Sequence, residues 1–200
     1  ALYLSGDNSS DDNIEDLTGL EAFVNISTIN ASNNEITSID VTQHIALENL
    51  RLSNNALTEI DLSQNMLLRL ISMYNNNLSS LDLTNNPALI SVLLSDMDLG
   101  TLDTSLNPLL RDLVAENCNL SSMELSNNSN LEIIILHNNP LQELDLSNTI
   151  LLEELGLITT QLTSLALGML PALKKVNLSG CELLHLDLSA NTALEEIDLR

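Results

Sequence analysis

The chain has 200 residues, of which 28 are acidic and 6 are basic, so its formal net charge at pH 7 is −22. A surface this negative repels the phosphates of nucleic acids and of anionic membranes, and we expect neither as a partner. No apolar run comes near the roughly 20 residues that cross a bilayer, so we expect no membrane insertion of this segment. Apolar residues make up 44% of the chain and aromatic residues only 2%, so a folded core must be mainly aliphatic.

Residues 1–25 differ from the rest of the chain and are expected to form an N-terminal strand, an acidic loop and a segment that leads into a repeat array. Leu2 to Ser5 alternate apolar and polar side chains, which is typical of a short strand. The loop that follows carries several oxygen-bearing side chains close together, which is the ligand chemistry that Ca²⁺ prefers. We therefore take the loop as a candidate Ca²⁺ site, with Asp7, Asp11, Asp12 and Asn13 as ligands. No other cofactor is expected.

A period of 21 residues governs the chain from residue 26 to residue 193, which gives eight repeats without insertion or deletion. Each repeat begins with an apolar residue: Ile26, Leu47, Leu68, Leu89, Leu110, Leu131, Leu152 and Leu173. Residues 194–200 begin a ninth repeat. Because a stack of repeats needs a polar cap at its end and none follows, we expect the array to continue in a longer protein.

Every repeat consists of two similar halves. Residues 47–55 read LxxLxLxxN, and residues 57–65 read LxxIxLxxN. The alternating apolar residues predict a short strand in each half, whereas strings such as SNN and TNNP interrupt any helix. The fold class predicted is a repeat solenoid with short parallel β-strands on both sides of the coil and little helix.

The unit LxxLxLxxNxL, followed by xxLDLSxN, resembles the leucine-rich repeats, specifically the nested 21-residue class of bacterial proteins. The segments IEDLTGLEAF (14–23) and LTEIDLSQN (57–65) resemble surface leucine-rich repeat proteins of Bacteroidetes-type bacteria. This resemblance covers residues 14–200. It implies an extracellular or cell-surface location, associated with the outer membrane of a Gram-negative bacterium. It says little about function, since such arrays serve many partners.

The polar residues that recur at fixed places in the repeat have structural interpretations. An Asn ends most half-repeats, as Asn55 and Asn65 do, and its amide can bond backbone groups that a bend leaves unpaired. Cys118 and Cys181 occupy the same place three repeats apart. At the spacing of stacked strands they are roughly 14 Å from each other, which is beyond the range of a disulfide.

An acidic column runs along the second halves of the repeats, interrupted by Ala166: Asp40, Asp61, Asp82, Asp103, Glu124, Asp145 and Asp187. Carboxylates stacked roughly 5 Å apart repel one another unless solvent or cations screen them. Two interpretations stay open, bound Ca²⁺ or a solvated face that belongs to the repeat consensus. A column without a cleft gives no reason to expect catalytic carboxylates, and no catalytic residue is expected.

The outward positions of the first halves vary from repeat to repeat. Polar residues occupy both ends of the array, whereas apolar residues and one histidine gather in the middle repeats: Leu70, Tyr74, Leu93, Val114, Ile133, Ile135, His137 and Ile158. Solvent-facing apolar residues that cluster on adjacent strands are typical of an interaction surface. These residues are the predicted binding site for a protein partner. A neighbouring domain or a second copy of the chain is the alternative occupant.

The function predicted is that of a non-enzymatic module that recognises a protein at the cell surface or outside the cell. One alternative is a structural spacer, or a subunit of a larger outer-membrane-associated assembly. Another is an adhesin that binds glycans. Because sugar sites usually stack on aromatic rings, Tyr74 alone gives that alternative little support.

Overall fold

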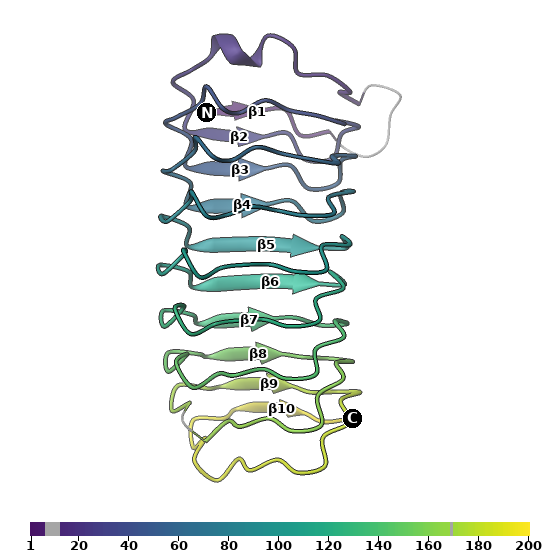
Figure 1. Ribbon diagram of the computed structural model, residues 1–200, viewed down its shortest axis with the longest axis vertical. Helices are drawn as coiled ribbons and strands as arrows, with labels where there is room; N and C mark the ends of the chain where they lie inside the picture. Colours follow the sequence, from purple (N-terminus) through teal and green to yellow (C-terminus); the bar gives the residue numbers. More distant parts are fainter. Residues whose placement is uncertain (7–12, 169) are drawn as a thin grey trace.

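The computed structural model describes residues 1–6, 13–168 and 170–200, which form a solenoid whose turns stack along one axis (Figure 1). One side of the coil is a single parallel sheet in which the strands follow one another in sequence order. Its strands are β1 (Leu2–Tyr3), β2 (Thr28–Asn30), β3 (Asn49–Arg51), β4 (Leu70–Ser72), β5 (Ser91–Ser95), β6 (Asp112–Glu116), β7 (Ile133–Ile135), β8 (Glu154–Gly156), β9 (Lys175–Asn177) and β10 (Glu196–Asp198).

Helix is nearly absent from the described residues. The structure has one short 3₁₀ helix, Leu20–Ala22, in the segment that leads into the repeats. Within the ranges that the structure describes, no helix has the length and hydropathy needed to cross a membrane. The prediction of a parallel solenoid with little helix is confirmed.

The 21-residue period sets the register of the sheet. From β2 onward paired residues of neighbouring strands are 21 positions apart, as Asn49 and Leu70 are, and Leu70 and Ser91. Equivalent side chains of successive repeats therefore form straight rows across the sheet. Strand β1 pairs outside this period, with Leu2 opposite Ile29.

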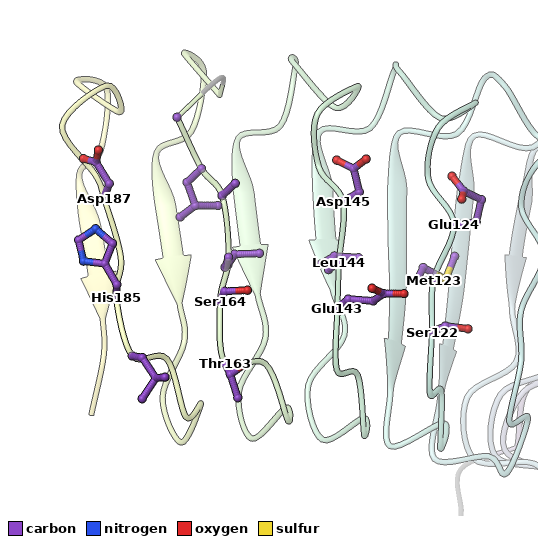
Figure 2. A pocket seen from close by; sticks show the side chains of 15 residues that line it. Ser122, Met123, Glu124, Glu143, Leu144, Asp145, Thr163, Ser164, His185 and Asp187 are labelled. Carbon is purple, nitrogen blue, oxygen red and sulfur yellow. The ribbon is translucent and has the colours of Figure 1, made fainter.

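The second halves do not form the strands that the sequence predicted. No described residue on that side belongs to a strand. A side chain closes most of the turns there: Asp61 Oδ1 accepts a hydrogen bond of 2.8 Å from the Ser63 backbone N–H, and Asp82 Oδ1 accepts one of 2.9 Å from Thr84. Figure 2 shows these segments side by side, with Glu124, Asp145 and Asp187 at equivalent places. In the second halves the alternating apolar residues therefore indicate which side chains are buried, and they do not indicate that the backbone is paired as a strand.

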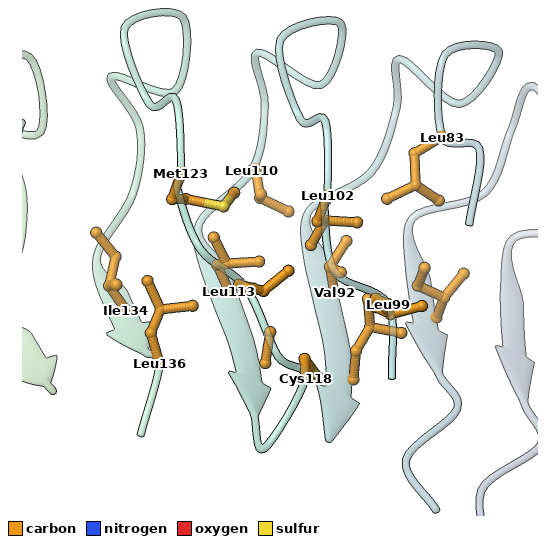
Figure 3. Packing of buried hydrophobic residues seen from close by; sticks show 14 of the residues in the cluster. Leu83, Val92, Leu99, Leu102, Leu110, Leu113, Cys118, Met123, Ile134 and Leu136 are labelled. Carbon is orange, nitrogen blue, oxygen red and sulfur yellow. The ribbon is translucent and has the colours of Figure 1, made fainter. Parts of the chain in front are cut away.

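The core is one continuous aliphatic cluster between the two sides of the coil. Figure 3 shows side chains of the strands, such as Val92 and Leu113, beside Leu102 and Met123 of the second halves. Inward residues of β2 to β9 are buried, whereas several second-half residues at the equivalent place are only half-buried, such as Ile60 and Leu144. Each fully buried aliphatic side chain contributes roughly 1.5–3 kcal/mol, so aromatic residues are not needed.

Two columns of buried polar residues brace the bends, as the sequence predicted. In the first column, Asn139 donates to the carbonyl oxygens of Ala115 and Leu136 and accepts from the N–H groups of Cys118 and Leu120. The second column is simpler. There Asn107 donates to two carbonyl oxygens, each at 3.0 Å, and its own Oδ1 has no partner among the described residues.

Both cysteines are free thiols within the stack. Cys118 is fully buried, and burial raises the pKa of its thiol to about 11. The Sγ of Cys181 contacts the hydroxyl of Thr160 at 3.2 Å and the carbonyl oxygen of Leu157 at 2.9 Å. The two residues replace the bend asparagines, and the prediction that they are not joined by a disulfide is confirmed.

Candidate interaction surfaces

The outward face of the sheet brings three of the predicted binding residues into one row. Leu93, Val114 and Ile135 pair with one another in register on β5, β6 and β7. All three are half-buried, with their side chains on the solvent side of the sheet. On this face they form a continuous aliphatic strip, which we name the sheet-face patch.

The other predicted residues lie on the same face at different distances from this strip. Ile133 is on β7 beside Ile135, and His137 and Ile158 follow the ends of β7 and β8. Leu70 and Tyr74 belong to the β4 turn, where Leu70 pairs with polar Ser91, and Tyr74 is 42% exposed. The structure therefore joins the residues of β5–β8 into one surface and leaves Leu70 and Tyr74 at its border.

His137 is held in a fixed orientation at the edge of the sheet-face patch. Its Nδ1 accepts a 2.9 Å hydrogen bond from the backbone N–H of Ile158. The ring packs closely against Gly156: a Cβ at that position would clash with the imidazole and with Ile135. Only glycine leaves room for the ring there. Burial lowers the pKa of His137, while the carboxylates of Glu116 and Glu154 act in the opposite direction.

Acidic side chains lie around the patch, and two of the nearby basic side chains are paired with carboxylates. Asp112 lies on β6 and accepts a hydrogen bond from Ser91, and Glu116 ends the same strand. Beside the sheet, Arg111 pairs with Glu132 and Lys174 pairs with Glu153. The surroundings of the patch are therefore negative, which favours a partner with a positive surface.

A second exposed apolar surface was missed from the sequence. Large side chains that are at least 44% exposed recur at four of the turns between a second half and the next strand: Ile45, Met66, Leu67, Leu106, Leu109, Ile150 and Leu151. We name these residues the turn ridge. In the sequence these residues could have been recognised as apolar residues beside the bend asparagines, at places outside the repeat motif. Met66 and Leu67 follow Asn65, for example, and Leu106 precedes Asn107. The ridge is interrupted at two turns, by Pro87 and Ala88 and by Ser129 and Asn130.

The acidic column has a structural role in every repeat where it is present. Each carboxylate accepts the backbone N–H two residues later, as Asp103 does from Ser105 and Asp145 from Ser147, both at 2.8 Å. These hydrogen bonds lower the pKa of the carboxyl groups. Among the described residues, no three His, Cys, Asp or Glu side chains lie where they could hold a metal ion.

Most of the proposed Ca²⁺ loop, Asp7, Asp11 and Asp12, lies outside the described residues. Asn13 is described, and its Nδ2 donates to Glu35 Oε1 at 3.1 Å. The loop stays a prediction. It is tested by melting the protein in EDTA and in millimolar Ca²⁺, where an unchanged midpoint contradicts the site.

Comparison with solved structures identifies the solenoid as one of leucine-rich repeat type. InlJ of Listeria monocytogenes, whose functional domain includes a cysteine ladder, matches at 26% identity and a TM-score of 0.76, over 94% of this chain and 46% of that one. A leucine-rich repeat protein of Leptospira interrogans matches at 22% identity and a TM-score of 0.83, over 90% of this chain and 50% of that one. Internalin C2 of L. monocytogenes matches at 20% identity and a TM-score of 0.77, over 90% and 84% of the two chains.

The chain thus spans about half the length of the first two proteins that it resembles. No protein-family model matches the chain, and no curated protein matches it. The likeness to these bacterial proteins is therefore one of fold.

Proposed function

We propose that this chain is a non-enzymatic recognition module that binds a protein partner through the sheet-face patch. The partner surface is apolar at its centre and basic at its edge. The module acts outside the cell or on the cell surface, attached to the outer membrane of a Gram-negative bacterium or to an assembly there. The sequence resemblance to the nested 21-residue class of Bacteroidetes-type surface proteins supports this location, and the likeness in fold to internalins of L. monocytogenes supports only its cell-surface part.

The observation that carries the proposal is the strip formed by Leu93, Val114 and Ile135. Backbone hydrogen bonds hold β5, β6 and β7, so these side chains are not needed to pair the strands. Covering the strip removes apolar area from water, which is worth about 25 cal/mol per Å². A rigid sheet also loses little conformational entropy when a partner binds.

The test compares capture of proteins from the envelope fraction of the source cells by two baits. One bait is the parent chain, and the other carries Leu93→Asp and Ile135→Asp. A partner retained by the parent and lost by the variant supports the proposal. The variant must give the circular dichroism spectrum of the parent and melt as one cooperative unit.

A matched control carries Leu106→Asp and Leu109→Asp, which add the same charge to the turn ridge and also remove two exposed leucines. We expect this control to capture the partner as the parent does. Loss of the partner with the ridge control alone contradicts recognition through the sheet-face patch. Equal recovery with all three baits, or no recovery, favours a structural spacer instead.

A further inference from the structure

A hollow of about 1110 Å³ lies on the side of the coil opposite the sheet. It crosses the second halves of four successive turns, at residues 122–124, 143–145, 163–168 and 184–187 (Figure 2). We name it the furrow. At the spacing of stacked turns it is roughly 14 Å long. It is a different surface from the sheet-face patch and shares no residue with it.

One of the turns that line the furrow departs from the repeat consensus. Asp145 and Asp187, on the turns to either side, each accept the N–H of a serine two residues later. The turn between them has Ala166 and Gly168 at these two places. A Cβ added at Gly168 would meet no atom within 4 Å. The missing carboxylate and hydroxymethyl group therefore leave open space where the other repeats carry side chains.

The walls of the furrow combine an apolar floor with a negative rim. Leu144, Leu165 and Met123 line the floor, and Leu184, which is 90% exposed, stands at one end. Among the described lining residues there is no lysine or arginine. The rim carries four carboxylates: Glu124, Glu143, Asp145 and Asp187. The arrangement suits a ligand that has both aliphatic and cationic groups.

We propose that the furrow binds an extended peptide segment in which lysine or arginine alternates with aliphatic residues. An extended strand rises about 3.3 Å per residue, so four or five residues span the furrow. Alternate side chains of such a segment point in opposite directions, so one set can meet the floor while basic groups reach the rim. Anionic ligands are repelled by the carboxylates, and the described lining has no Phe, Tyr or Trp ring on which a sugar could stack.

The probe is a six-residue peptide of alternating lysine and leucine, with blocked ends, titrated into the ¹⁵N-labelled chain. We expect saturable shifts of the backbone amide signals of residues 163–168 and of the furrow residues on the neighbouring turns, 122–124 and 143–145. Amide signals of β5–β7 should not shift, which separates this site from the proposed function. A peptide of alternating lysine and serine should bind at least tenfold more weakly, because it has no group for the floor.

The decisive variant carries Ala166→Asp and Gly168→Ser, which restore the repeat consensus. These changes are compatible with the fold, because Asp145 and Ser147 make the same turn one repeat earlier. They place a carboxylate and a hydroxymethyl group in the open space of the middle turn and also add a negative charge. If the hollow is the site, affinity for the lysine–leucine peptide falls at least tenfold. If general charge attraction causes binding, affinity rises.

A control variant, Gln64→Asp, adds the same charge to an exposed position on a distant turn. It should bind the peptide as the parent chain does. Three results overturn the proposal: no saturable shift with the parent, equal binding of the lysine–serine peptide, or unchanged or tighter binding by the filled variant.

Discussion

The two sides of the coil carry the same alternating pattern but stabilise the backbone in different ways. On the sheet side, N–H and carbonyl groups of neighbouring strands bond one another, as in the pairing of β5 with β6. On the second-half side a carboxylate closes the turn, as Asp61 does with Ser63. The outward residue there is constrained, whereas the outward residues of the sheet can vary without loss of hydrogen bonds. The outward side chains of the sheet can therefore change from repeat to repeat to fit a partner.

Core packing should show the largest difference between the two sides. Leu113 of β6 is fully buried, and Leu144 at the inward place of a second half is half-buried. We expect Leu113→Ala to lower the free energy of unfolding by about 2–5 kcal/mol, since it leaves a cavity in a closed layer. Leu144→Ala should cost about half as much. Urea unfolding followed by circular dichroism measures both, and equal losses contradict the difference in packing.

The bend asparagines should show the next largest difference. Asn139 makes two donor and two acceptor hydrogen bonds to buried backbone groups, whereas Asn107 makes two donor bonds. Each buried polar group left unpaired costs about 1–3 kcal/mol. Asn139→Ala should therefore destabilise the chain more than Asn107→Ala, by roughly 2 kcal/mol. The same urea titration measures this, and the reverse order contradicts the hydrogen-bond assignment.

The acidic column should make stability fall at low pH. Hydrogen bonds from Ser63 lower the pKa of Asp61 below its ordinary value of 3.8. A lowered pKa in the folded state gives stability that is present above pH 3.8 and is lost as the pH falls through the lowered value. Asp61→Asn keeps an acceptor for the Ser63 N–H, and Asp61→Ala removes it. At pH 7 we expect Asp61→Ala to melt at a lower temperature than Asp61→Asn.

His137 should produce the smallest effect, a weak pH dependence on the sheet side. Burial lowers its pKa in the folded chain below the ordinary value of 6.5. As the pH falls below 6.5 the unfolded chain takes up the proton first, so stability decreases until the pH reaches the lowered value. His137→Gln should remove this decrease, because Gln does not titrate. Melting temperatures between pH 7.5 and 5 measure it, and identical slopes for parent and variant contradict it.

The sequence was sufficient to predict the stacked repeats, the strands of the first halves and the buried asparagines, because each follows from a strict period. It could not predict that the second halves lack strands, since Ile60 and Leu62 alternate as strand residues do while Asp61 takes the turn N–H. The turn ridge was missed because Met66 and Leu67 lie outside the motif. The furrow was missed because the motif does not show which lining side chains leave space open, as Ala166 and Gly168 do.

The central claim is that the variable face of the sheet is the surface that meets the partner. Site-specific photo-crosslinking tests it most directly, with a benzophenone amino acid placed singly at Val114 on the sheet-face patch or at Leu106 on the turn ridge. Both positions carry aliphatic side chains with access to solvent. Irradiation in the native envelope should join a partner to the chain from position 114 and not from 106. A crosslink from 106 alone, or from neither position, contradicts the account.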